Sequence, residues 1–248
     1  MHRFYLPSER CAGNVLRLDG REAHHALHVL RVKRGEQVVV LDGAGHEFFC
    51  EIANCSREAL ELRVIKKNFV PSLPCQITLL QALPKGKIIE SIIQKSVELG
   101  AHRIVPLLTE HVVTQLDEDG AEHKREKWQQ IAIEAIKQCG GAWLPKIEAP
   151  TTIEKYLARQ EKFDLALAGS LQSERRHPRE CFQKFRGKHG RLPQSVGVWI
   201  GPEGDFTLDE LKAIEAGGAL PISLGLLVLR VETAAIYCLS ILNYELSR

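Results

Sequence analysis

The chain has 248 residues, with 33 Lys or Arg against 31 Asp or Glu, and its formal net charge is +2. Hydrophobic residues make up 44% and charged residues 26%, an ordinary globular composition that excludes disordered, collagen-like and coiled-coil chains. No apolar run is long enough to cross a membrane, and the first ten residues hold no signal-peptide core. Seven scattered cysteines without a C-x-x-C pair indicate reduced thiols, so we expect a cytoplasmic protein that is not held in a membrane.

The first part of the chain predicts a small module of short strands. A glycine turn at 43–45 joins two of them into a hairpin, and residues 21–35 predict a short helix between the first two. Prolines at 71 and 74 mark a boundary, so we expect domains at 1–72 and 73–248. The expected strands are residues 15–18, 36–42, 46–53 and 59–65.

The second domain predicts strands that alternate with helices. This pattern is typical of a mostly parallel α/β sheet covered by helices on both faces. Thr207 and Glu210 have the spacing of a capping box at the start of one helix. The expected strands are 77–83, 102–108, 163–169, 195–201 and 221–225, and the expected helices are 87–100, 124–141, 153–160, 207–218 and 232–246.

Positive charge gathers in two places, residues 1–72 and the segment 172–194, which has seven Lys or Arg against two Glu. Either island is a solvated surface or a contact for a polyanion, because Lys and Arg neutralise phosphates. Phe4 and Tyr5 beside Arg3 could stack on bases, but packing in the core is the default for such side chains.

Three segments follow expected strands at the edge where α/β sheets bind ligands: 168–174, 199–207 and 223–235. In the second, Gly201 and Gly204 flank Pro202–Glu203, which is typical either of close backbone approach to a ligand or of a plain turn. In the third, Arg230 stands in an apolar stretch and needs a carboxylate partner or an anionic substrate.

Several catalytic and cofactor motifs are absent. The one G-x-G lies inside the expected hairpin, and there is no Walker A loop, no G-x-S-x-G elbow and no H-E-x-x-H. His24, His25 and His28 cluster without a further ligand group nearby in the sequence. We therefore expect no metal. Glu232 or Thr233 is expected to cap the last helix.

Seven segments, in chain order, carry a resemblance to a known family. The chain resembles the small-subunit (16S) ribosomal RNA uridine-N3 methyltransferases of the SPOUT superfamily. The segments are RFY (3–5), HHALHVLRVKRG (24–35), VLDGAGHEF (40–48), GKIIESIIQKSVELG (86–100), KWQQIAIEAIKQCG (127–140), IGPEGDFTLDEL (200–211) and LGLLVLRVETAA (224–235).

The resemblance implies an N-terminal PUA-like RNA-binding β-barrel and a C-terminal α/β domain tied in a trefoil knot. It also implies S-adenosylmethionine as cofactor, ribosomal RNA or the small ribosomal subunit as partner, and a homodimer. The residues implied to bind the cofactor are Ala168, Gly169, Ser170, Leu171, Ile200, Gly201, Pro202, Glu203, Gly204, Leu224, Gly225 and Leu229. The residues expected to contact RNA are Arg3, Arg31, Lys33 and Arg34.

The chemistry of such a reaction suggests two catalytic candidates. Uracil N3 is a poor nucleophile until its proton leaves, so a cation near the base would stabilise the anion that forms. Arg230 is the candidate for this role or for placing a phosphate. Glu203 accepts a proton or only orients its loop, and we favour the orienting role. The uridine would have to be flipped out of any base pair.

This chain lacks several cations that the family pattern carries, at Ile88, His111, Gln115, Gly141 and Leu227. GPEGG also becomes GPEG followed by Asp205. Two alternatives therefore stay open: a divergent enzyme that methylates another RNA site, and a non-catalytic RNA-binding or ribosome-assembly protein.

Overall fold

The computed structural model describes residues 1–110, 118–171 and 175–246, and the chain divides into two compact units. The first unit is Met1–Ser72 together with Ile133–Leu144, and the second is Leu73–Ala132 together with Pro145–Arg248. The first unit thus includes a segment that the sequence analysis places in the second domain. Among the described residues, no helix has the length and apolar character needed to span a membrane.

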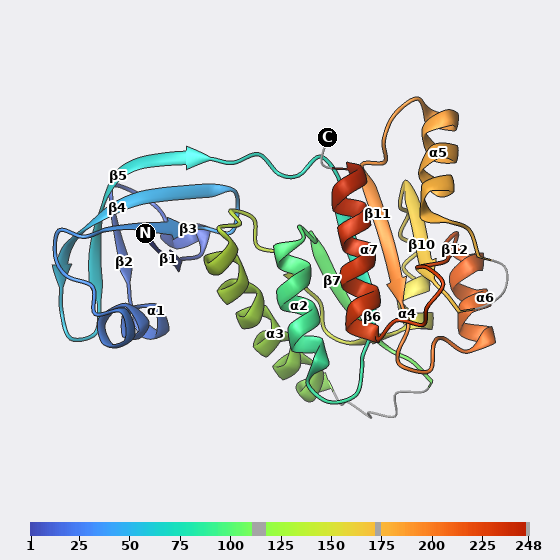
Figure 1. Cartoon of the computed structure of the whole chain (residues 1–248). Helices are drawn as coiled ribbons and strands as arrows, with labels where there is room; N and C mark the ends of the chain where they lie inside the picture. Colours follow the sequence, from blue (N-terminus) through green and yellow to red (C-terminus); the bar gives the residue numbers. More distant parts are fainter. Residues whose placement is uncertain (111–117, 172–174, 247–248) are drawn as a thin grey trace. The chain divides into compact units, whose positions relative to one another are not determined.

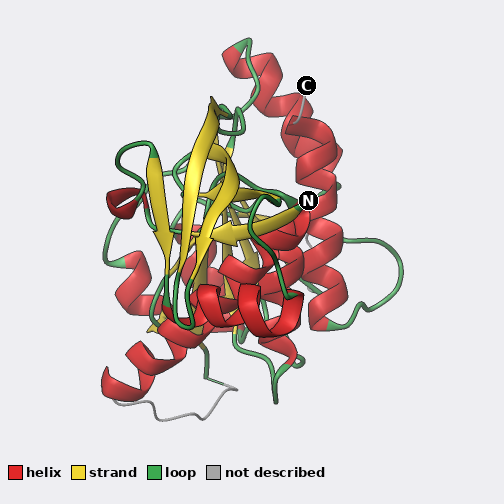
Figure 2. Cartoon of the chain, turned by 90° about the vertical axis from the view of Figure 1, so that its left-hand side faces the viewer, coloured by secondary structure: helices red, strands yellow, loops and turns green. Residues whose placement is uncertain are grey.

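The first unit is built on a five-stranded sheet in the order β1-β3-β4-β5-β2. β1 runs parallel to β3, and the other neighbours are antiparallel, including the predicted hairpin of β3 and β4. β1 was not predicted, because it depends on pairing with β3, a strand more than thirty residues away in the sequence. Figure 2 shows strands in yellow and helices in red. The strands are β1 (His2–Tyr5), β2 (Val15–Leu18), β3 (Gln37–Leu41), β4 (His46–Cys55) and β5 (Leu60–Phe69).

Short helical turns complete this unit. The predicted helix is present as α1 (Gly20–His24), continued by a π-helical segment, η2 (His25–Leu30), and a 3-10 turn, η1 (Ser8–Arg10), lies ahead of β2. Phe4 is fully buried in the core of the unit, as the default predicts, and Tyr5 is half-buried.

Polar contacts hold the end of α3 (Glu118–Cys139) in the first unit. The ammonium of Lys137 is buried and lies 2.7 Å from Glu22 Oε1. The guanidinium of Arg3 donates to the carbonyl oxygens of Lys137 and Gln138, at 3.4 and 3.3 Å. A cation at these carbonyls is favourable because they form the negative end of the helix dipole.

The second unit is built on a parallel sheet in the order β12-β10-β11-β6-β7-β8, with β9 paired to β7. The predicted strands are all present, and their apolar runs reflect burial on both faces. The strands are β6 (Gln76–Ala82), β7 (Arg103–Leu108), β8 (Lys146–Ile147), β9 (Thr151–Thr152), β10 (Leu165–Gly169), β11 (Ser195–Ile200) and β12 (Leu220–Ile222).

Helices cover both faces of this sheet. α4 (Ile153–Leu157) and α6 (Leu208–Ala216) pack on one face in a core that includes Trp199 and Phe206. α2 (Ile88–Glu98) and α7 (Val231–Leu246) lie side by side, and α7 contacts β6 and β11 (Figure 1). Residues 223–230 thus return the chain from the edge strand β12 to the middle of the sheet. The trefoil threading itself stays a prediction.

The basic segment 172–194 contains a helix that was not predicted, α5 (Pro178–His189). Pro178 stands at its first turn, the His177 ring accepts from the Arg179 N–H, and Gly190 ends it in the left-handed conformation. The helix packs through one stripe of buried residues spaced three or four apart. They are Pro178, Cys181, Phe182 and Phe185.

Two helix starts test the capping predictions. The capping box of Thr207 and Glu210 at α6 is confirmed, because each side chain accepts from the other's backbone N–H. The expected cap of the last helix is wrong. α7 begins at Val231, so Glu232 and Thr233 lie inside its first turn and Arg230 holds the capping position.

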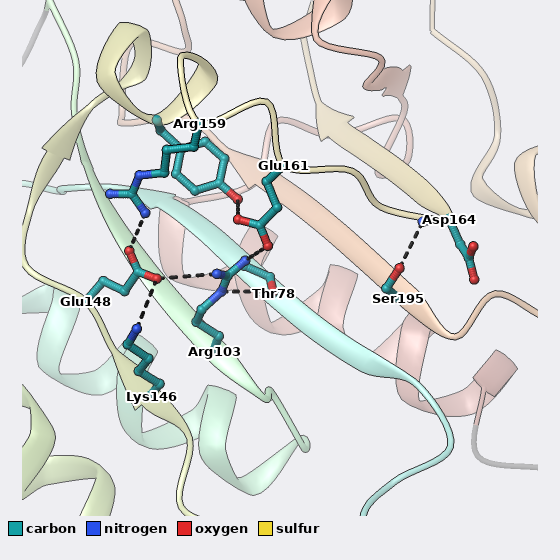
Figure 3. A network of polar contacts seen from close by, with 9 residues as sticks. Thr78, Arg103, Lys146, Glu148, Arg159, Glu161, Asp164 and Ser195 are labelled. Atoms are coloured by element: carbon teal, nitrogen blue, oxygen red, sulfur yellow. Dashed lines mark hydrogen bonds and ion pairs between the residues drawn. The ribbon is translucent and has the colours of Figure 1, made fainter.

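A polar network fastens the end of the sheet where the strands begin (Figure 3). Arg103, the first residue of β7, bridges Glu148 and Glu161 and also contacts Thr78 of β6. Arg159 adds a second cation to Glu148, at 2.6 Å. These contacts join β6, β7 and the segment after α4 at the end of the sheet opposite to the strand ends described next.

Candidate active site

Three neighbouring strands end together in the second unit. β10 pairs in parallel with β11 on one side and with β12 on the other, so that Gly169, Ile200 and Ile222 close their carboxyl ends. The chain passes from β10 to β11 and then back across β10 to β12. Such a reversal of strand order opens a crevice between the loops, which is where α/β sheets bind ligands.

A cavity of about 400 Å³ lies in this crevice. The three loops that the resemblance implies all contribute to its wall, and so does Arg230. The implied cofactor residues that line it are Gly169, Ser170, Leu171, Ile200, Gly201, Pro202, Glu203, Leu224, Gly225 and Leu229.

Two of the implied cofactor residues do not line the cavity. Ala168 is fully buried in the core under α4 and α6, because alternate residues of a strand point to opposite faces. Gly204 is exposed and is not part of the cavity wall. Both residues belong to the segments that carry the resemblance, and their part in cofactor binding stays a prediction.

Two glycines keep the wall of the cavity open. A Cβ on Gly201 would lie 2.9 Å from Asp205 Oδ1 and 3.1 Å from the Phe206 nitrogen. A Cβ on Gly169 would lie 3.3 Å from Ile200 Cδ1 and 3.4 Å from Leu224 Cδ1. Each glycine therefore allows a backbone approach that a side chain would obstruct.

Asp205 ties two of the loops together. Its Oδ2 accepts from the Leu171 N–H and its Oδ1 from the Phe206 N–H, both at 2.8 Å. Its own N–H donates to Pro202 O at 3.0 Å. The residue has a φ of +63°, a left-handed conformation that costs a non-glycine residue roughly 1–2 kcal/mol. The hydrogen bonds offset that cost and fix the loop around Gly201.

The Glu203 side chain links two loops at the cavity. Its Oε1 accepts from the Lys85 N–H at 3.0 Å, which joins the loop after β11 to the loop after β6. The side chain is exposed at the cavity wall. This contact supports the orienting role that the sequence analysis favours.

Arg230 lines the cavity, and its charge has no partner among the residues that the structure describes. The structure records no hydrogen bond or ion pair for its guanidinium among the described residues, so the carboxylate considered in the sequence analysis is not found there. It stands at the capping position of α7, where Ser, Thr, Asp or Asn is usual and where the helix dipole disfavours a cation. The guanidinium is therefore available to an anion in the cavity.

Two of the residues that replace family cations also line this cavity. Ile88, at the start of α2, is half-buried, and Leu227 is 79% exposed. Gly141 belongs to the segment held by the first unit, whereas His111 and Gln115 lie outside the described residues. The cavity wall is therefore more apolar than the family pattern implies.

Several wall residues were not assigned to the site by the sequence analysis. Arg175 donates to Ser170 O at 3.2 Å, and Asp205, Val228 and Glu232 also line the cavity. Asp205 was visible only as a departure from the family motif. Arg175 lay in the basic island, and nothing in its spacing distinguished it from a surface residue.

In the first unit, the four residues expected to contact RNA have two different surroundings. Arg3 is occupied by the end of α3, whereas Arg31, Lys33 and Arg34 are exposed and their side chains have no recorded partner among the described residues. Arg31 holds a left-handed conformation at the end of the π-helical segment. These three cations form a local group in the sequence that is open to a polyanion.

The metal-ligating and thiol side chains of the described residues are dispersed or buried. The described residues contain no group of three His, Cys, Asp or Glu placed to hold a metal ion. All seven cysteines are free thiols, and burial raises the pKa of Cys50, Cys75 and Cys238 to about 12. These three thiols are therefore neutral and are poor nucleophiles.

Comparison with known proteins identifies the domains. Residues 71–243 match the model of an RNA methyltransferase domain, and residues 18–65 match that of an RNA methyltransferase PUA domain. The first unit is thus a PUA domain with a half-barrel sheet, and the second is a parallel α/β methyltransferase domain.

Relatives match over nearly the whole length. The ribosomal RNA small subunit methyltransferase E of Bacillus subtilis is 32% identical over 92% of this chain and 89% of its own. A methyltransferase from Legionella pneumophila, solved with the bound cofactor SAM, is 33% identical, with a TM-score of 0.87 over 98% of this chain and 97% of its own. A ribosomal RNA small subunit methyltransferase E from Neisseria gonorrhoeae, bound to S-adenosyl methionine, is 25% identical, with a TM-score of 0.85 over 99% and 98%. The chain belongs to the ribosomal RNA small subunit methyltransferase E family.

Proposed function

We propose that this protein transfers a methyl group from S-adenosylmethionine to N3 of one uridine in 16S ribosomal RNA. The observation that carries the proposal is the cavity at the ends of β10, β11 and β12, whose wall includes Arg230, a cation with no ion pair to any described residue. Family membership supports the substrate class, and the bound cofactor of two similar structures supports the methyl donor.

The wall of the cavity fits this cofactor. Gly169 and Gly201 leave backbone N–H and C=O groups open to the polar parts of a nucleoside, and Ile200, Leu224 and Leu229 supply apolar surface for a base. The bound cofactor supplies an electrophilic methyl group on a sulfonium. No metal is needed for this chemistry.

Arg230 is the proposed catalytic residue. The uracil N3 proton must leave before N3 can attack, and negative charge then spreads over N3 and the two neighbouring carbonyl oxygens. A guanidinium with no protein partner stabilises that charge most where water is excluded. Glu203 keeps the loop in place through the Lys85 N–H, which makes it a positioning residue.

The PUA domain is proposed to hold the RNA. Arg31, Lys33 and Arg34 would neutralise phosphates, whereas Arg3 serves the packing of α3. The target uridine is flipped out, because N3 is hidden in a base pair.

A homodimer in the cytoplasm is part of the proposal. Tyr237 and Tyr244 of α7 are 46% and 68% exposed, and Leu226 before the helix is fully exposed. Apolar side chains in such positions are typical of a protein interface. Sedimentation velocity of the purified protein tests this, and a monomer at micromolar concentration contradicts it.

The reaction is tested with unmodified small ribosomal subunits and labelled S-adenosylmethionine, followed by nuclease digestion and mass spectrometry. A single 3-methyluridine in the RNA is expected. Methylation at another site favours the divergent enzyme, and no transfer with intact cofactor binding favours the non-catalytic protein. Arg230→Ala should abolish transfer and leave cofactor affinity by calorimetry within about two-fold. A collapse of cofactor affinity would contradict the role given to Arg230.

A further inference from the structure

The α5 helix and the two residues that lead to its first turn form a strongly cationic surface on the methyltransferase domain. Between 175 and 189 the chain has six Lys or Arg and one acidic residue, Glu180, although the whole chain carries only +2. All six cations are exposed. We call this set the α5 cations; its members are Arg175, Arg176, Arg179, Lys184, Arg186 and Lys188.

The α5 cations differ from cations on other helices because they form no ion pair within the described part of the chain. Lys95 of α2, Lys127 of α3 and Lys212 of α6 each hold an ion pair with a glutamate or aspartate. None of the α5 cations has an ion pair with a described residue, and only Arg175 has a side-chain hydrogen bond, to a backbone carbonyl. Repulsion among unpaired cations destabilises a surface, so an external anion would relieve it.

This surface begins at the wall of the active site. Arg175 lines the cavity and donates to Ser170 O at 3.2 Å. The Arg176 N–H donates to Pro221 O at 3.1 Å, and its carbonyl accepts from the Ser223 N–H at 2.9 Å. The backbone before α5 is therefore fastened to the end of β12, and the cations extend away from the cavity along a helix of twelve residues, roughly 18 Å long.

The position of each cation on the helix also fits a chain of phosphates. Pro178, Cys181, Phe182 and Phe185 bury one stripe, which directs Arg179 and Arg186 to one flank and Lys184 and Lys188 to the other. Arg179 and Arg186 are two turns apart, roughly 10 Å along the helix axis. Exposed guanidinium groups in a row suit a polyanionic backbone that continues beyond the active site.

We infer that the α5 cations form a second RNA-contact surface, located on the methyltransferase domain itself, that binds phosphates of the strand flanking the target nucleotide. The inference rests on the proposed RNA substrate and adds to it a site outside the PUA domain. The contacts are electrostatic and carry no sequence preference. They hold the strand beside the cavity and leave the choice of nucleotide to other residues.

The test compares two double variants of the full chain. Arg179→Gln with Arg186→Gln removes two α5 cations, and Lys155→Gln with Lys212→Gln removes the same charge from exposed positions of α4 and α6. Binding of transcribed, unmodified small-subunit RNA is measured between 50 and 300 mM salt. The α5 variant should lower the slope of log K against log salt by about 1.4, because each single-strand phosphate contact contributes about 0.7. The control variant should keep the slope of the unaltered protein.

Methyl transfer and cofactor binding separate the possible outcomes. The α5 variant should raise KM for the RNA several-fold, with kcat and cofactor affinity unchanged. Suppose that the unaltered protein methylates RNA and that the α5 variant matches the control variant in KM and in the slope of log K against log salt. The proposed RNA-binding role of the α5 cations is then refuted, and the proposed reaction stands. If the unaltered protein does not methylate RNA, the proposed function fails, and an α5-dependent salt slope would still support the RNA surface.

Discussion

Asp205 combines a strained backbone with hydrogen bonds that join two loops of the candidate active site. It is one of three described non-glycine residues with positive φ, with Arg31 and Gln160. Its carboxylate accepts two backbone N–H groups from two different loops, each worth about 0.5–1.5 kcal/mol. A glycine at this position would remove the strain but also the link between the loops.

Substitution of Asp205 should therefore depend on the residue introduced. Asp205→Ala loses both hydrogen bonds and keeps the strain, whereas Asp205→Gly loses the bonds and relieves the strain. Alanine should lower the free energy of unfolding by about 1 kcal/mol more than glycine, since the left-handed conformation costs roughly that much. Urea denaturation measures both. Equal losses would show that the backbone of the loop relaxes.

Gly201 tests whether the shape of the same loop matters for the cofactor. A methyl group at this position would meet Asp205 Oδ1 at 2.9 Å, which forces the Asp205 loop outward. Gly201→Ala should weaken S-adenosylmethionine binding by at least ten-fold in calorimetry. Gly187→Ala is the control, because a Cβ there has no neighbour within 4 Å and lies in a helix. An unchanged affinity in Gly201→Ala would mean that the loop has room to move.

At the scale of elements, sequence periodicity predicts the second unit well and fails where local signals are weak. The buried strands have apolar runs and the amphipathic helices have clear stripes, so both are recognisable from residue order alone. α5 was missed because its polar face is dense in Arg and Lys and Gly187 interrupts it, while its four buried residues are too few to dominate the pattern. β1 depends on pairing with β3, a partner more than thirty residues away.

The start of β10 gives a prediction on acid stability. Arg191 holds the pKa of Asp164 down to about 2, with help from the backbone N–H of Gln194. A carboxylate with a lowered pKa in the folded state adds stability above its unfolded pKa of about 3.9, and that stability is lost as the pH falls toward the folded value. Between pH 4 and pH 2 the unfolding free energy should therefore fall less steeply in Asp164→Asn than in the unaltered protein.

Salt provides the control for this pair. The Asp164 and Arg191 side chains are 25% and 44% exposed, so 1 M salt should screen part of the contribution of this ion pair to the unfolding free energy. Chemical denaturation measures the unfolding free energy at each pH. If this free energy falls equally between pH 4 and pH 2 in Asp164→Asn and in the unaltered protein, the ion pair with Arg191 does not contribute to stability.

At the scale of the whole molecule, the cavity of the candidate site could be predicted in outline because its three loops follow three strands that are recognisable in the sequence. The family resemblance implied most of the residues that line the cavity, but the exceptions depend on side-chain direction, as Ala168 shows, and on hydrogen bonds between loops, as Asp205 shows. The assignment of residues 133–144 to the first unit was also hidden. It rests on contacts between residues far apart in the sequence, among them the Lys137–Glu22 ion pair and the hydrogen bonds of Arg3 to the end of α3.

The ion pair of Lys137 and Glu22 should decide whether the PUA domain keeps its fold. The two side chains are 6% and 16% exposed, and Glu22 also accepts from the Tyr5 N–H of β1 at 3.1 Å. Lys137→Ala leaves Glu22 without its cation and should cost about 3–5 kcal/mol, because a buried charge then lacks compensation. Hydrogen exchange should show faster exchange of the β1 amides. Lys127→Ala, which removes an exposed pair from the same helix, should cost under about 1 kcal/mol.

The double variant Lys137→Met with Glu22→Gln separates the penalty of an unpaired charge from the value of the ion pair itself. Removing both charges should restore most of the stability that Lys137→Ala loses, because neither side chain is then charged and unpaired. The β1 amides should recover their protection in the same variant. If the double variant is as unstable as Lys137→Ala, the ion pair is required for residues 133–144 to pack in the first unit, and the loss cannot be attributed to the buried charge of Glu22.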